Sequence, residues 1–269
     1  MKAMDHIHLN GGEHAVMLLY GLSGSPLEII YLATKLNEEG YSVEIPHIPG
    51  YEHSVQGEII KPHEFWVNSA IDYFHQMKRK YKSVSIGGLS AGAVLCLRLA
   101  ELVGNEVSAL ILLSTTLYTD GWSIPWYQVF LPLLYFSPFR YKLSFKESEP
   151  FGIKNLERRA IASKGMTENA VSITGGSAIS LFKLYQARQL NHLVIKNLSL
   201  ITCPTLVIHA VEDDTASLKN MELVLANISS PFVKQLTLQD SYHIITVDNE
   251  KEKVVQSCID FLQQALLDG

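Results

Sequence analysis

The sequence predicts an α/β fold in which a mostly parallel sheet carries helices on both faces. Apolar runs of strand length alternate along the chain with stretches whose apolar residues recur every three or four positions, a spacing typical of helices. Two of these runs, residues 15–20 and 109–114, are almost wholly apolar, as in strands that are buried on both faces. The alternation stops near residue 116 and resumes near residue 201, which indicates one domain with an insertion rather than two domains.

Capping residues and apolar periodicity mark the elements before the insertion. Ser25, Pro26 and Glu28 stand at the cap, first and third positions of a helix that Gly40 ends, in the order of a capping box. Apolar residues at helical spacing predict a second helix from about 62 to 80, and Gly104 ends a third. The expected strands in this half are residues 5–9, 15–20, 42–48, 85–89 and 109–114.

The stretch SIGGLSAGA, residues 85–93, places a G-x-S-x-G turn between an apolar strand and an apolar helix. Such a turn holds a serine hydroxyl in the open on a strained backbone, and Gly88 and Gly92 leave room around Ser90. Ser90 also begins the helix, whose unpaired N–H groups and positive dipole end point at any oxyanion formed there. We interpret Ser90 as a nucleophile; a plain glycine turn with Ser90 as a helix cap is the alternative.

A second glycine-rich loop, GLSGSP at residues 21–26, follows the strand at 15–20. Its N–H groups can face Ser90 across the carboxyl edge of the sheet, where ligands of parallel sheets bind, and the Leu22 N–H is the candidate donor to an oxyanion. Ser23 resembles half of another nucleophile turn, but the final glycine is missing and no helix begins on it. Ser23 and Ser25 are therefore interpreted as turn and cap residues.

Two acidic residues and a histidine follow the strands beyond the insertion. A strand at residues 205–210 precedes Asp213 and Asp214, and the last strand, 234–238, precedes His243. A carboxylate just past a strand's carboxyl end can reach a histidine over the same edge. Asp213 is the preferred partner, and Asp214 is expected nearer the cap of the helix at 217–228. A final helix is expected from about 250 to 267.

Residues 116–200 are predicted to form a cap over a body made of residues 1–115 and 201–269. The first part of this cap is rich in aromatic and aliphatic side chains. They can line an acyl pocket, face a lipid surface or pack the cap against the body, and packing is the default for large apolar side chains. The longest apolar stretch, residues 126–139, contains Pro132 and Pro138, so we do not expect it to cross a bilayer as one helix.

The order Ser90, Asp213, His243 on such a chain resembles the α/β-hydrolase family over nearly the whole sequence. Four pieces resemble bacterial carboxylesterases and monoacylglycerol lipases: YGLSGSP at 20–26, GLSAG at 88–92, AVED at 210–213 and HIITVD at 243–248. The resemblance implies Ser90 as nucleophile, His243 as base and Asp213 as the carboxylate that orients it. It also implies the backbone N–H groups of Leu22 and Ala91 as oxyanion donors. The chain departs from the pattern at Tyr20-Gly21, where these relatives usually carry His-Gly.

The composition of the chain argues against several classes of protein. With 269 residues, 47% hydrophobic and 18% charged, the chain can bury one substantial core. A net charge of -5 without a long basic stripe argues against nucleic acid as the main partner. The apolar run at 15–20 is too short for a signal peptide or a membrane span, and the three separated cysteines, Cys96, Cys203 and Cys258, are typical of reduced thiols in a cytoplasmic protein.

We therefore predict a serine hydrolase that cleaves carboxylic esters of uncharged, partly apolar acyl groups. The partner is a small-molecule ester, and transient contact of the cap with a lipid surface stays open. No metal-ligand spacing and no dinucleotide fingerprint is found in the sequence, so neither a metal nor a cofactor is expected. An acyl thioesterase is the close enzymatic alternative. A non-catalytic protein that holds a lipid-like or hormone-like ligand on the same fold is the alternative from another class.

Overall fold

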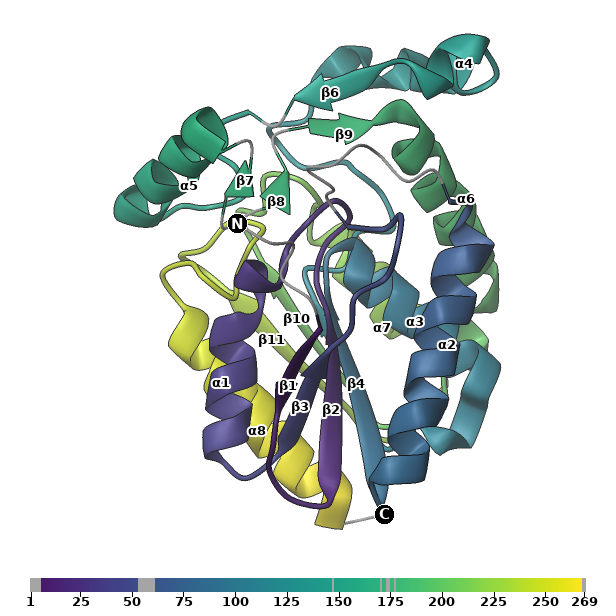
Figure 1. Ribbon diagram of the computed structural model, residues 1–269, viewed down its shortest axis with the longest axis vertical. Coiled ribbons are helices and arrows are strands. Elements are labelled where there is room, and N and C mark those ends of the chain that lie inside the picture. Colours follow the sequence, from purple (N-terminus) through teal and green to yellow (C-terminus); the bar gives the residue numbers. More distant parts are fainter. Residues whose placement is uncertain are drawn as a thin grey trace.

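The computed structural model describes residues 6–52, 61–146, 148–169, 171–172, 175–176 and 178–267. Its main sheet has seven strands in the order β1-β3-β2-β4-β5-β10-β11 (Figure 1). Within this sheet, as far as the structure describes it, only β1 runs antiparallel to its neighbour, and the other neighbouring pairs are parallel. The strands are β1 (Ile7–Leu9), β2 (His14–Leu19), β3 (Ser42–Ile45), β4 (Ser83–Leu89), β5 (Leu110–Leu113), β10 (Thr205–Ala210) and β11 (Val233–Leu238). The predicted mostly parallel sheet is confirmed.

Helices cover both faces of this sheet, as predicted. α1 (Ile30–Glu38) and α8 (Lys251–Leu267) contact each other on one face, and α2 (His63–Lys80) and α3 (Ala91–Val103) contact each other on the opposite face (Figure 1). α7 (Lys219–Asn227) packs on β10. The apolar strand residues between the two helix layers belong to one continuous buried cluster, which a chain of this length can form.

Two predicted elements differ from the structure by more than two residues at one end. β3 ends at Ile45 rather than residue 48, because Pro46 follows and has no backbone N–H for the strand ladder. The first helix begins as a separate 3₁₀ turn, η1 (Pro26–Glu28), in which Ser25 caps the Leu27 N–H, and α1 starts only at Ile30. The Glu28 carboxylate, predicted for a capping box, accepts a hydrogen bond from the Gly21 N–H in the preceding loop.

The segment between β5 and β10 divides into two parts. α6 (Leu181–Asn197) packs along α3, whereas α4 (Leu131–Tyr135) and β6 (Ser144–Lys146) lie beyond the carboxyl ends of the sheet strands (Figure 1). The boundaries of the body and cap at 115/116 and 200/201 stay a prediction. No helix in the described part of the chain is long and apolar enough to cross a bilayer. The remaining elements are η2 (Gly104–Glu106), η3 (Trp126–Phe130), η4 (Pro138–Tyr141), α5 (Leu156–Asn169), β7 (Val171–Ser172), β8 (Gly175–Gly176), β9 (Ala178–Ser180) and η5 (Leu198–Leu200).

Candidate active site

Ser90 stands at the turn between β4 and α3 with a strained backbone. Its φ is 58° and its ψ is -122°, a region that side-chain-bearing residues rarely adopt. A Cβ atom on Gly88 would lie 2.3 Å from the backbone of Gly92. A Cβ atom on Gly92 would lie 2.5 Å from the carbonyl oxygens of Leu19 and Tyr20. Both positions therefore require glycine, and the tight turn predicted here is confirmed.

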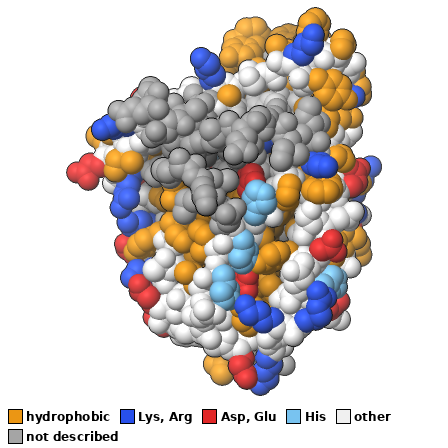
Figure 2. All heavy atoms as spheres, in the orientation of Figure 1, with side chains coloured by type: hydrophobic (Ala, Val, Ile, Leu, Met, Phe, Trp, Pro, Cys, Tyr) orange, Lys and Arg blue, Asp and Glu red, His pale blue; other side chains and the backbone are white. Residues whose placement is uncertain are grey.

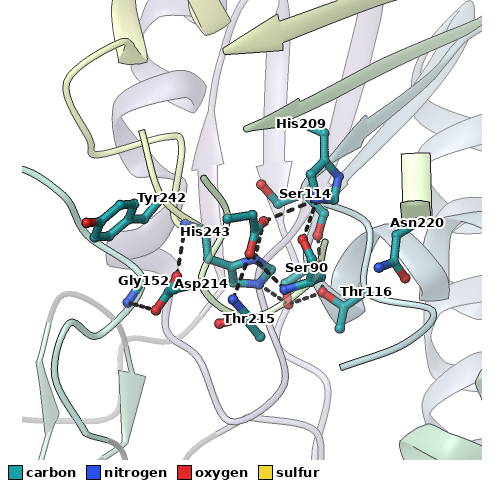
Figure 3. Close-up of polar contacts among 12 residues, drawn as sticks. Ser90, Ser114, Thr116, Gly152, His209, Asp214, Thr215, Asn220, Tyr242 and His243 are labelled. Carbon is teal, nitrogen blue, oxygen red and sulfur yellow. Dashed lines mark hydrogen bonds and ion pairs between the residues drawn. The ribbon is translucent and has the colours of Figure 1, made fainter. Parts of the chain in front are cut away.

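His243 reaches Ser90 from the loop after β11. Its Nε2 lies 2.8 Å from Ser90 Oγ (Figure 3). Its Nδ1 lies 2.9 and 2.8 Å from the two carboxylate oxygens of Asp213, which follows β10. With its Nδ1–H donated to a carboxylate, a neutral imidazole presents its Nε2 lone pair to the hydroxyl. The structure thus brings together the three side chains that the sequence predicts to meet at this edge.

The Asp213 carboxylate is buried and held by several donors. Its Oδ1 accepts hydrogen bonds from the backbone N–H groups of Thr215 (2.9 Å) and Ala216 (2.8 Å), and its Oδ2 lies 3.3 Å from His209 Nε2. Burial alone would raise the pKa of Asp213, but the charge of His243 and the hydrogen bonds of both imidazoles hold it well below its usual range. The carboxylate therefore stays ionised.

The environment of His243 strengthens it as a base. Burial alone would lower the pKa of its imidazole, but the charge of Asp213 and the hydrogen bond to that carboxylate outweigh burial. Asp214 and Glu28 add smaller contributions in the same direction, and the pKa of His243 is raised above its ordinary value. The ring consequently takes up a proton more readily than a free histidine does.

Asp214 contacts backbone rather than the imidazole ring. Its carboxylate accepts hydrogen bonds from the backbone N–H groups of His243 and Gly152, both at 3.3 Å (Figure 3). Burial raises the pKa of Asp214. The expectation that it lies near a helix cap is wrong, because α7 begins only at Lys219, after a turn. Of the two neighbouring carboxylates, Asp213 is the one that contacts the His243 ring.

The loop after β2 lies against the turn at Ser90. A Cβ atom on Gly21 would lie 3.6 Å from Ser90 Cβ and 4.0 Å from Ser90 Oγ, which places the neighbouring Leu22 backbone close to the hydroxyl. Ala91 is the first residue of α3, so its N–H has no partner within the helix. Within the described residues, neither the Leu22 nor the Ala91 N–H donates a hydrogen bond. Both are thus available to an oxygen atom at Ser90.

Ser23 and Ser25 occupy the turn and cap positions predicted for them. Ser23 is buried in the turn with a φ of 58°, and its hydroxyl accepts a hydrogen bond from Lys183 Nζ at 3.3 Å. Ser25 caps η1 through the Leu27 N–H. Their hydroxyls are therefore engaged in holding the loop.

Glu28 is a site neighbour that sequence reasoning does not find. Its side chain is only 2% exposed, and Oε2 accepts a hydrogen bond from the Gly21 N–H at 2.9 Å. Its backbone carbonyl accepts a hydrogen bond from the hydroxyl of Thr246, in the loop that carries His243. Glu28 thus connects the loop after β2 with the loop after β11. Its place in a capping-box pattern gives no sign of this, because the contacts form only in the folded chain.

Thr116 is a second neighbour that the sequence does not reveal. Its Oγ1 lies 3.1 Å from Ser90 Oγ and donates a hydrogen bond to the Ser114 carbonyl, also at 3.1 Å (Figure 3). A hydroxyl that already donates to a carbonyl can only accept from Ser90, so Thr116 Oγ1 at 3.1 Å and His243 Nε2 at 2.8 Å compete for the single Ser90 proton. Thr116 stands where the cap is predicted to begin, and only the end of β5 beside β4 brings it to the serine.

Tyr20 replaces the expected histidine and faces a polar network. Its hydroxyl donates to Glu52 Oε2 at 2.8 Å, and Glu52 also pairs with His47 Nδ1 at 2.6 Å. Lys183 Nζ, from α6, donates to the Glu52 backbone carbonyl at 2.6 Å. Tyr20, where the chain departs from the family pattern, is thus linked through Glu52 to Lys183 of α6.

The whole chain is similar to known lipolytic enzymes. It is 24% identical over 258 residues to a carboxylesterase of Bacillus subtilis (strain 168), which covers 94% of each chain. It is 22% identical to a thermostable monoacylglycerol lipase of Bacillus sp. (strain H-257), covering 97% of this chain and 95% of the relative. Among solved structures, it matches the monoacylglycerol lipase of Paleococcus ferrophilus with a TM-score of 0.80, 16% identity and coverage of 97% and 98%. A structure of the metagenome-derived lipolytic enzymes LipS and LipT matches with a TM-score of 0.82, 20% identity and coverage of 98% and 99%.

These structural matches establish the fold, which is that of the α/β-hydrolases. The family model Hydrolase_4, described as serine aminopeptidase S33, matches residues 12–251, which include the turn at Ser90, both carboxylates after β10 and His243. The protein is therefore a member of the Hydrolase_4 (serine aminopeptidase, S33) family of hydrolases.

Proposed function

We propose that the protein is a serine hydrolase that cleaves carboxylic esters of uncharged, partly apolar acyl groups. The observation that carries this proposal is the chain of contacts from Ser90 Oγ to His243 Nε2 at 2.8 Å and from His243 Nδ1 to the Asp213 carboxylate. A hydroxyl, an imidazole and a buried carboxylate in this order form the arrangement that activates a serine for attack on an acyl carbon. The carboxylesterase and monoacylglycerol lipase among the relatives support esters over other acyl compounds.

In the proposed mechanism, His243 takes the Ser90 proton as the hydroxyl oxygen attacks the ester carbonyl carbon. Asp213 holds the imidazole in place and stabilises its positive charge. His243 then gives the proton to the leaving alcohol, which leaves an acyl group on Ser90. Water, activated by the same imidazole, attacks this acyl-enzyme and releases the acid.

We assign the oxyanion of the tetrahedral intermediate to the Leu22 and Ala91 N–H groups. Both donors belong to backbone that is fixed before substrate binds, which is what makes such donors effective. The Glu28 carboxylate supports this assignment, because its hydrogen bond to the Gly21 N–H holds the Tyr20–Gly21 peptide group, which adjoins the peptide group that carries the Leu22 N–H.

We assign residues 116–200 to a cap that selects the acyl group and contacts lipid surfaces. The part around α4 exposes large side chains: Trp126 is 80% and Phe136 82% exposed. Figure 2 shows hydrophobic side chains gathered over this end of the molecule, with basic ones among them. Residues 121–146 contain Arg140, Lys142 and Lys146 and no acidic residue, although the whole chain is acidic. Exposed aromatic residues beside basic ones are typical of contact with anionic lipid surfaces.

We also assign the protein to a reducing compartment, the cytoplasm. Cys96, Cys203 and Cys258 are all free thiols buried in the body. Disulfides are rare, and free thiols common, in the cytoplasm.

The test is hydrolysis of p-nitrophenyl esters graded in acyl length by the full chain, beside matched thioesters and an aminoacyl p-nitroanilide. We expect turnover of the oxygen esters with an optimum at an apolar acyl group. A higher kcat/KM on the matched thioester would replace the proposal by an acyl thioesterase. Tight retention of an acyl ligand without any turnover would replace it by a binding protein.

A further inference from the structure

A second cluster of histidine and carboxylate side chains lies at the outer edge of the sheet. The cluster lies at β1 and β3, and β2 separates β3 from β4, the strand that precedes Ser90. In the register of β1 and β3, His8 stands opposite Glu44, and His6 lies two residues before His8 and so on the same face. Figure 2 shows histidine side chains beside acidic and basic ones over the region of β1.

The ligand atoms of this cluster are close enough to share one ion. The Glu44 carboxylate lies 2.9 Å from His6 Nε2 and 3.1 Å from His8 Nδ1. One nitrogen of each imidazole and one carboxylate oxygen all lie within 4.8 Å of one another. A tetrahedral Zn²⁺ with bonds of about 2.0–2.1 Å holds its ligand atoms about 3.3 Å apart, so small side-chain movements suffice.

The hydrogen bonds of His8 leave two acceptors facing each other. His8 Nε2 lies 2.5 Å from the side-chain oxygen of Asn10 and 3.4 Å from Lys80 Nζ; the much shorter contact is to an acceptor and places the proton of a neutral ring on Nε2. His8 Nδ1 then presents a lone pair, and within the described residues this buried atom makes no hydrogen bond. A nitrogen lone pair and a Glu44 oxygen 3.1 Å apart repel each other. A cation between them would replace this repulsion with two bonds.

Neighbouring hydroxyls hold the carboxylate in place. Tyr73 donates to Glu44 Oε2 at 2.6 Å, and Tyr81 donates to Glu44 Oε1 at 2.8 Å. Such outer contacts orient the ligands of metal sites. Two imidazoles and one carboxylate form a ligand set that suits Zn²⁺ and related divalent ions, with a fourth position for water.

We propose that His6, His8 and Glu44 bind a divalent transition-metal ion of the Zn²⁺ class and that the ion ties β1 to β3. β1 is three residues long and only half-buried, so a metal bridge would be a main support of this edge strand. The Lys80 ammonium, 3.2 Å from Glu44 Oε1, competes with the ion, but its side chain is 53% exposed and can turn into solvent. This site is independent of the proposed ester hydrolysis.

The experiment is a calorimetric titration of the tag-free full chain with ZnCl₂, with the visible absorption of Co²⁺ as a second probe. We expect one ion per chain and a rise in Tm with Zn²⁺. Loss of a residue that only orients a metal ligand typically weakens metal binding by about 10–100-fold. His6→Ala and His8→Ala each remove a ligand itself, so each should weaken Zn²⁺ binding by more than that. Lys80→Met should strengthen binding, because it removes the competing charge.

The matched control is His47→Ala, which removes another histidine that pairs with a carboxylate, Glu52, and should leave Zn²⁺ binding unchanged. Far-UV circular dichroism and ester hydrolysis report whether each variant is folded. The inference is overturned if the wild-type chain takes up no Zn²⁺. It is also overturned if the folded double variant of His6 and His8 binds Zn²⁺ with the same stoichiometry and affinity.

Discussion

The sheet edge around Ser90 and the outer part of the cap hold their side chains in opposite ways. At the sheet edge, a Cβ atom on Gly88 or Gly92 would collide with backbone, and Asp213 and His243 are 2% and 4% exposed. Around α4, in contrast, Trp126 and Phe136 are more than three-quarters exposed. Close packing fixes positions to fractions of an ångström, whereas an exposed surface tolerates change.

This difference fits the division of functions that we propose. Proton transfer and oxyanion binding at Ser90 would need fixed geometry, as at the buried sheet edge. Selection of a substrate or contact with a lipid surface would need accessible apolar area, as around α4. Substitutions at the sheet edge should therefore change kcat, and substitutions on the cap should change binding to apolar partners.

The largest expected effect is that of Ser90→Ala. Without the hydroxyl no acyl-enzyme can form, and kcat/KM for a short p-nitrophenyl ester should fall by at least about 10⁴-fold. Ser23→Ala is the matched control, since Ser23 is a buried serine in the neighbouring loop, and it should retain activity within about tenfold. Equal losses in the two variants would contradict the assignment of Ser90.

The neighbouring carboxylates of Asp213 and Asp214 allow a comparison of two substitutions at the same sheet edge. Asp213→Asn removes the negative charge that stabilises the His243 imidazolium, and its amide NH₂ favours the imidazole tautomer with the proton on Nε2, so kcat should fall by about 10⁴-fold. Among the described residues, the Asp214 side chain accepts hydrogen bonds from the backbone N–H groups of His243 and Gly152, so kcat of Asp214→Asn should fall by about tenfold or less. Steady-state kinetics on one ester would test both, and the reverse ranking would exchange their roles.

Glu28 tests whether the loop after β2 must be held for catalysis. Glu28→Ala leaves the buried Gly21 N–H without its acceptor and loosens the backbone before Leu22. We expect a loss in kcat of about 10–10³-fold with little change in KM, and a smaller loss in Glu28→Gln, whose amide oxygen can still accept. If Tm changes but kcat does not, Glu28 stabilises the fold and has no role in positioning the loop for catalysis.

The pH profile reports the state of His243. Only the neutral imidazole can take the Ser90 proton, so kcat/KM falls as the pH drops through the pKa of His243. Because Asp213 raises this pKa, the acidic limb should lie above the unperturbed value of about 6.5. In Asp213→Asn, the acidic limb of the pH profile of the residual kcat/KM should lie at a lower pH than in the wild type. If the position of this limb does not change, His243 is excluded as the group whose titration it reports.

The smallest effect on catalysis is expected from substitutions on the cap. Trp126→Ser and Phe136→Ser alter exposed side chains, so Tm should change little and turnover of a short soluble ester should stay the same. Sedimentation with vesicles that contain anionic lipid should show weaker binding, because apolar area is lost from the contacting face. If the double variant binds vesicles as well as the wild type does, the proposed contact between the cap and lipid surfaces is wrong.

Much of the sheet edge could be predicted because its signals are local. The G-x-S-x-G turn requires glycine at two fixed positions, and apolar runs mark the buried strands that bring Ser90, Asp213 and His243 to one edge. The neighbours of these residues could not be predicted. Glu28 has the sequence position of a helix-capping residue, yet its carboxylate contacts Gly21, because its partner is chosen by tertiary packing.

The remaining differences have one local cause and two tertiary causes. β3 stops at Ile45 because one proline lacks a donor, although the apolar pattern continues to Ile48. The cluster of His6, His8 and Glu44 escapes any search for ligand spacing, because Glu44 comes from another strand and joins the histidines only through strand register. α6 has the mixed composition of the cap but packs along α3, which its weak periodicity does not reveal.

The most direct test of the central claim is labelling with a fluorophosphonate followed by peptide mass mapping. The probe forms a covalent bond only with a serine that a neighbouring base has activated. We predict one adduct per chain, on the peptide that contains Ser90, and none in Ser90→Ala. An adduct on another residue, or ester hydrolysis that persists in an unlabelled Ser90→Ala preparation, would contradict the account.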